Sequence, residues 1–165
     1  MDGAQLYDDD IVTWAEEQAA ALRALATRPD LSNALDWANL IEEIESLGRR
    51  EWKEVESQIR NALRHIVKGC CDPDCLSRQA WSVETAAFLD EVRNEYRPSM
   101  RRLIDLDRVW KRAFARAMDE LRPYGVVVPP GIPMLSPFSL DDILSLSFTY
   151  EVAVAKLGRL AGATH

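Results

Sequence analysis

A row of polar residues follows one face of the helix that the sequence predicts from residue 36 to about residue 68. Glu51, Gln58 and His65 succeed one another at seven-residue steps, so an α-helix places them on one side. On the helical wheel, Glu51 lies inside the apolar stripe, where a carboxylate needs a partner or has a raised pKa. We expect Glu51 either to bind an Arg or a Trp indole of another helix or to form a proton-transfer or metal site with His65.

Glu43, earlier on the same predicted helix, completes a set of three candidate catalytic residues with Glu51 and His65. Acids beside a histidine would suit a small hydrolase or nuclease-like enzyme, with a metal ion as an option. In di-metal helical bundles, however, Glu-x-x-His pairs bind the ions, whereas here Ala62 stands three residues before His65. We therefore expect the glutamates at the start of this helix to be solvated or ion-paired, namely Glu42, Glu43 and Glu45.

Histidine and cysteine residues form a second candidate ligand set at the end of this helix. Cys and His are the side chains that zinc prefers, and His65, Cys71 and Cys75 lie within eleven residues, together with Cys70. Their spacing does not match a zinc finger or ribbon, and the chain contains no second pair of such ligands. Free thiols in a loop are the simpler expectation, and the sequence predicts no cofactor.

Apolar residues at spacings of three and four predict the helices that must position these side chains. The predicted helices cover about residues 9–28, 36–68, 77–96, 98–122 and 140–146, and a tail helix could follow at 148–160. Asp36 is expected to cap the second helix, and Ser139 with Asp142 resembles a capping arrangement for the fifth. Gly48 lies on the apolar stripe, which suggests a close helix crossing or a bend.

Between residues 126 and 137 the chain combines several prolines with apolar residues, which favours an extended segment over a strand in a sheet. A length of 165 residues fits a single domain spanning the chain. We therefore predict an all-α fold, namely an up-and-down four-helix bundle with a proline-rich C-terminal wrap and one or two short terminal helices.

Composition argues against nucleic acids and membranes as partners. The chain carries 27 acidic against 20 basic residues, a net charge of −7, which disfavours binding to phosphate backbones or anionic lipids. It holds no apolar run long enough to span a bilayer, and its first residues lack the pattern of a secretory signal. Three cysteines, two of them adjacent at Cys70 and Cys71, argue against a disulfide framework. These features predict a cytoplasmic location.

Basic residues concentrate in the predicted helix 98–122. They include Arg101, Arg102, Arg108, Lys111, Arg112 and Arg116. Such a helix could meet a phosphate backbone, but in an acidic chain we favour ion pairs with the acidic surfaces of the first two helices, or with a partner.

Several segments resemble a known family. They are Leu6-Tyr7-Asp8, Trp14-Ala15-Glu16-Glu17, the run from Asp36 to Arg49, and Pro137-Phe138-Ser139-Leu140-Asp141-Asp142-Ile143-Leu144. Together they resemble the bacterial family called domain of unknown function 29. The resemblance implies a bacterial, all-helical protein without an established activity, and it supplies no catalytic residue. The chain departs from the family pattern at Gly69-Cys70-Cys71, where bulkier and often aromatic residues are expected.

The leading functional hypothesis is a non-enzymatic interaction or scaffold module that works through a homodimer or a protein partner. An exposed apolar surface beside the proline-rich wrap would mark the partner site, with residues such as Val126, Val127, Val128, Ile132 and Met134. One alternative is the hydrolase or nuclease-like enzyme that uses Glu43, Glu51 and His65. The other is a nucleic-acid binder through the basic helix 98–122.

Overall fold

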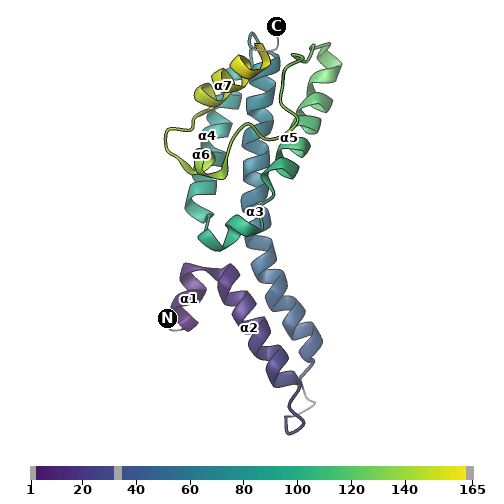
Figure 1. The fold of residues 1–165 in the computed structure, drawn as a ribbon, viewed down its shortest axis with the longest axis vertical. Coiled ribbons are helices and arrows are strands. Elements are labelled where there is room, and N and C mark those ends of the chain that lie inside the picture. Colours follow the sequence, from purple (N-terminus) through teal and green to yellow (C-terminus); the bar gives the residue numbers. More distant parts are fainter. Residues whose placement is uncertain (1–2, 32–34, 163–165) are drawn as a thin grey trace. The chain divides into compact units, whose positions relative to one another are not determined.

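Helices account for all the regular structure in the computed structural model, which describes residues 3–31 and 35–162 (Figure 1). The α-helices are α1 (Gly3–Asp9), α2 (Ile11–Ala26), α3 (Trp37–Cys71), α4 (Arg78–Glu95), α5 (Leu106–Leu121), α6 (Leu140–Leu144) and α7 (Tyr150–Gly162), and the 3-10 helices are η1 (Pro98–Arg102) and η2 (Arg122–Tyr124). The prediction of an all-α fold is therefore confirmed for the described residues. In these ranges, no helix has both the length and the apolar character that a membrane crossing requires.

Internal contacts group the chain into two compact units, which we describe separately. Unit 1 comprises Met1–Glu54 and Tyr96–Leu103, and unit 2 comprises Val55–Glu95 and Ile104–His165. The long helix α3 therefore contributes residues to both units. The organisation of residues 1–165 as a single domain stays a prediction.

The first helix begins later than the sequence predicted, and a short helix precedes it. Asp10 has a non-helical backbone conformation, and its side chain accepts a hydrogen bond from the Thr13 amide at 3.0 Å. This N-cap separates α1 from α2. The predicted helix 9–28 is therefore wrong at its start: α1 ends at Asp9, and α2 runs from Ile11 to Ala26. The run of aspartates at 8 to 10 contained the cap, but the sequence did not show which residue would take that role.

In unit 1, helix α2 crosses α3 at Gly48. A Cβ atom added at Gly48 would lie 3.0 Å from the Cβ atom of Ala15 and 3.6 Å from the Cα atom of Val12, both on the buried face of α2. A larger residue would push the two helices apart, so glycine permits this approach. The predicted close crossing at Gly48 is confirmed.

The predicted helix 98–122 is wrong as one continuous helix. Pro98 opens a 3-10 helix of five residues, and α5 starts only at Leu106. Asp105 adopts an extended conformation and accepts a hydrogen bond from the Arg108 amide at 3.0 Å, which makes it the N-cap of α5. The apolar spacing continues across this break, and periodicity alone therefore could not detect it.

The core of unit 2 receives side chains from α3, α4, α5, α6 and α7. In Figure 1, α4, α6 and α7 lie on one side of α3 and α5 on the other. The largest side chains buried in this unit are Ile59, Leu63, Ile66, Leu89, Trp110, Ile143 and Leu157. Each stabilises the fold by roughly 1.5–3 kcal/mol relative to an exposed position.

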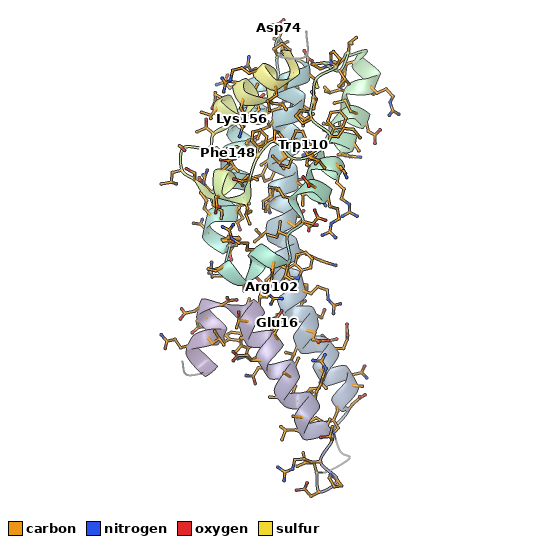
Figure 2. All side chains as sticks on the ribbon, in the orientation of Figure 1. Glu16, Asp74, Arg102, Trp110, Phe148 and Lys156 are labelled. Atoms are coloured by element: carbon orange, nitrogen blue, oxygen red, sulfur yellow. The ribbon has the colours of Figure 1, made fainter. Side chains whose placement is uncertain are left out.

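The segment between η2 and α6 is fastened to this core at defined points. The Trp110 indole, labelled in Figure 2, donates a hydrogen bond to the Pro133 carbonyl at 2.9 Å. Phe138 packs edge-on against Trp110 and against Phe148, with ring centroids 6.1 and 5.1 Å apart. A capping box formed by Ser139 and Asp142 then starts α6, as the sequence predicted.

Candidate functional site

His65 lies in the interior of unit 2, where α3 faces α4. Its side chain is buried and stacks on the Phe88 ring, with centroids 5.9 Å apart and planes 10° apart. Its Nε2 atom lies 3.0 Å from a carboxylate oxygen of Glu84, whereas its Nδ1 atom is buried without a hydrogen-bond partner. Burial, and then the nearby charges of Arg64 and Lys68, lower the pKa of His65 to about 4.

These surroundings define the protonation state of His65 at neutral pH. An imidazole with a pKa near 4 is neutral, so one ring nitrogen carries a proton and the other does not. Placing that proton on Nε2 provides a donor for the Glu84 carboxylate, while the other tautomer would leave two acceptors 3.0 Å apart. The Arg64 guanidinium lies 3.3 Å from Nε2. Its positive charge disfavours a second proton on the ring and so helps to lower the pKa of His65.

One helical turn further along α3, Lys68 is the centre of a charged cluster. Its Nζ atom lies 4.4 Å from the centroid of the Trp81 ring and 3.0 Å from a carboxylate oxygen of Glu120 on α5. Glu120 also forms ion pairs with Arg116 at 3.0 Å and with Arg64 at 3.4 Å. Burial alone would raise the pKa of Glu120, but the Lys68 hydrogen bond and the charges around it lower that pKa below its ordinary value.

A cavity of about 420 Å³ adjoins this cluster. Its lining residues come from α3, α4, α5 and the connections after them, and they are Lys68, Asp72, Cys75, Ser77, Trp81, Glu120, Leu121 and Tyr124. A volume of this size is in the range of small-molecule sites in proteins. Of this set, only Cys75 was a candidate ligand on the sequence, because the other lining residues come from separate parts of the chain and no local spacing connects them.

The three candidate catalytic residues do not form one site. Glu43 is exposed and Glu51 half-buried, and both lie on the same helix as His65. His65 lies fourteen helical positions after Glu51, a distance of about 21 Å at 1.5 Å per residue. Because side chains cannot span that distance, a reaction shared by the two residues has no geometric support. No ion pair or hydrogen bond connects Glu51 to another described residue.

The candidate metal ligands also remain apart. In the ranges 3–31 and 35–162, no group of three or more His, Cys, Asp or Glu side chains is arranged to hold a metal ion. Helix α3 continues through Cys71, three residues beyond its predicted end, so Cys70 and Cys71 are helical and not in a loop. Burial raises the pKa of Cys71 to about 12, which keeps its thiol protonated.

Two basic residues of the region 98–122 pair with the first two predicted helices, as the sequence favoured. In unit 1, Arg102 forms an ion pair with Glu16 of α2 (Figure 2). In unit 2, Arg108 pairs with Glu56 of α3 at 2.7 Å. Glu56 is 7% exposed and was missed by the sequence analysis, although it stands three residues before the buried Ile59 and therefore follows the apolar spacing.

Replacing Arg108 by Ala should lower the free energy of unfolding by about 1–2 kcal/mol, because it leaves the buried Glu56 carboxylate without its partner. The loss is moderate because half of the Arg108 side chain is in contact with solvent. Urea titration at pH 7 measures the change. The control is Arg112→Ala on the same helix, an exposed arginine that should change stability by less than about 0.5 kcal/mol. Equal losses in both variants would contradict the role of the Glu56 pair.

Comparison with known proteins supports the family resemblance. The model of the family described as "Domain of unknown function DUF29" matches residues 6–149. A crystal structure of an alpha-helical protein of unknown function from Rhodospirillum rubrum is 31% identical, with a TM-score of 0.84 over 92% of this chain and 97% of that chain. No curated protein matches the chain. The chain belongs to the DUF29 family.

Proposed function

We propose that this protein is an interaction and scaffold module whose proline-rich segment, residues 124–135, binds a second copy of the chain. The observation that carries the proposal is a set of exposed apolar side chains on one segment, whose C-terminal end is hydrogen-bonded to α5. Tyr124, Val127 and Met134 have exposed fractions of 81%, 84% and 85%, and Leu135 is also exposed. Apolar side chains held in this way mark a contact surface.

The segment is exposed although the structure holds it in place. The Pro133 carbonyl accepts the Trp110 indole hydrogen bond, and the Ser136 amide donates to Asp107 of α5 at 2.9 Å. The end of the segment that carries Met134 and Leu135 therefore loses little conformational freedom when a partner binds, which lowers the cost of association.

Charge favours a second copy as the partner. The run from residue 123 to residue 140 contains no charged residue, in a chain whose net charge is −7. Two copies of an acidic protein repel each other over most of their surfaces, and an uncharged apolar segment is where they can meet without that repulsion. The scaffold is the predicted up-and-down four-helix bundle with the proline-rich wrap, supported by the ion pairs that connect α3 with α5 in unit 2. Its proposed location is the cytoplasm, which agrees with three free cysteines.

Light scattering over a range of protein concentrations tests this function. We expect the wild-type chain to pass from monomer to dimer, and Val127→Asp and Met134→Asp to weaken the dimer by about tenfold or more, because each buries a charge in the interface. Both side chains are mostly exposed, so neither substitution should unfold the protein.

The matched control is Leu146→Asp, at a side chain that is equally exposed (84%) but lies outside the segment. This variant should dimerise as the wild type does. A wild-type chain that remains monomeric at every concentration, or a dimer that all three variants weaken to the same extent, would overturn the proposal.

A further inference from the structure

Lys68 is a buried lysine with unused hydrogen-bonding capacity. Its ammonium group has three N–H donors, of which one serves Glu120 and one side of the group faces the Trp81 ring. Among the described residues it makes no other hydrogen bond, although the residue is only 9% exposed. A buried donor without an acceptor is costly, and this one lines the cavity of about 420 Å³.

Other donors line the same cavity. The hydroxyl groups of Ser77 and Tyr124 have no hydrogen-bond partner in the described part of the chain, and both residues belong to the lining. Ser77 directly precedes α4, an eighteen-residue helix whose N-terminal end carries a partial positive charge. Three donors with different geometries are therefore available to an acceptor placed inside the cavity.

The charges around the cavity favour an anion with a single charge. Arg64, Lys68 and Arg116 surround the one carboxylate of Glu120, which leaves an excess of positive charge at this point. Asp72 is a second carboxylate in the lining, besides Glu120, and it would repel a doubly charged group such as phosphate more strongly than a singly charged one. A ligand with one carboxylate is attracted by the excess positive charge, and Asp72 repels its single charge less than it would repel two.

The remaining lining indicates what the ligand carries besides its charge. Trp81, Leu121 and Tyr124 contribute apolar and aromatic surface to the same lining. A site that combines charged and polar groups with apolar surface fits a ligand that has both parts. We propose that this cavity binds a small organic carboxylate with an aromatic or aliphatic body, its carboxylate held by Lys68 and its body placed against Leu121 and Tyr124.

Benzoate is the test ligand, compared with acetate and inorganic phosphate on the full chain. Titration followed by ¹H–¹⁵N NMR should show saturable shifts of the Trp81 indole and the Ser77 amide with benzoate. Acetate, which lacks the apolar body, should bind several-fold more weakly. Lys68→Met should lower the affinity for benzoate by about tenfold or more, because the charged donor is lost. This variant keeps Glu120 paired with Arg64 and Arg116, so its fold should be retained.

Lys156→Met is the matched control. Lys156 is also a lysine beside a carboxylate and an aromatic ring, 3.4 Å from Asp142 and 5.2 Å from the Phe138 centroid, but it does not line this cavity. Benzoate should bind this variant as it binds the wild type. The proposal is overturned by the absence of saturable binding, by equal effects of the two substitutions, or by phosphate binding more tightly than benzoate.

Discussion

Replacing Gly69 by Ala should lower the free energy of unfolding by about 3 kcal/mol, because the new methyl group has no space. A Cβ atom at this position would overlap the hydroxyl oxygen of Tyr150 and lie 2.7 Å from the adjacent ring carbon. Tyr150 is 3% exposed and starts α7, so its ring cannot turn into solvent without moving that helix. Urea unfolding at pH 7, followed by circular dichroism, measures the loss.

Gly158→Ala provides the matched control for this prediction. Gly158 lies inside α7, and a Cβ atom there would meet no atom within 4 Å. The same substitution should therefore stabilise the protein by about 0.5–1 kcal/mol, since alanine favours the helix and restricts the unfolded chain. Opposite signs at the two glycines would show that α7 packs directly on α3. A Gly69→Ala variant as stable as the wild type would contradict that packing.

The contact at Gly69 also explains why the sequence predicted the end of α3 wrongly. A glycine followed by two cysteines and Asp72-Pro73 has the composition of a loop, so the prediction ended the helix at about residue 68. The structure continues α3 to Cys71 because Tyr150, about eighty residues further along the chain, fills the space beside Gly69. Tertiary packing thus overrides local propensity here.

Features that depend on neighbouring residues were predicted well. The cap at Asp36, the capping box of Ser139 with Asp142, and the crossing at Gly48 all follow from residues near one another or on one helical face. The break between η1 and α5 was missed because the apolar spacing runs through it. The spacing of apolar residues therefore predicts which segments are helical and which faces are buried better than it predicts where one helix ends and the next begins.

The candidate site shows the same limit more strongly. The spacing of residues along α3 pointed to Glu51, which has no partner among the described residues, and gave no signal for Lys68. What gives Lys68 its chemistry is Trp81 on α4 and Glu120 on α5, and no spacing in the sequence reports that they meet. The seven-residue steps placed His65 in a polar row beside the apolar stripe, whereas the structure buries it, and its neighbours again come from α4.

Acid should destabilise the protein between pH 6.5 and about 4 through His65. Above pH 6.5 the imidazole is neutral in both the folded and the unfolded chain, so His65 adds no pH dependence. Below that value the unfolded chain takes up a proton that the folded chain refuses until about pH 4, so stability falls as the pH falls. The shift corresponds to a loss of up to about 3 kcal/mol, measured by urea titrations at pH 7, 6, 5 and 4.

His65→Phe isolates this contribution from those of other groups. A phenylalanine keeps the stacking on Phe88 and leaves the exposed Glu84 carboxylate in solvent, so the variant should fold. Glu120 and Asp142 have lowered pKa values and also lose stabilisation in acid, but they do so equally in both proteins. The difference between wild type and variant should therefore change by about 3 kcal/mol from pH 7 to pH 4. Parallel curves over this range would mean that His65 takes up its proton in the folded protein as easily as in water, and that the interior around it is open to solvent.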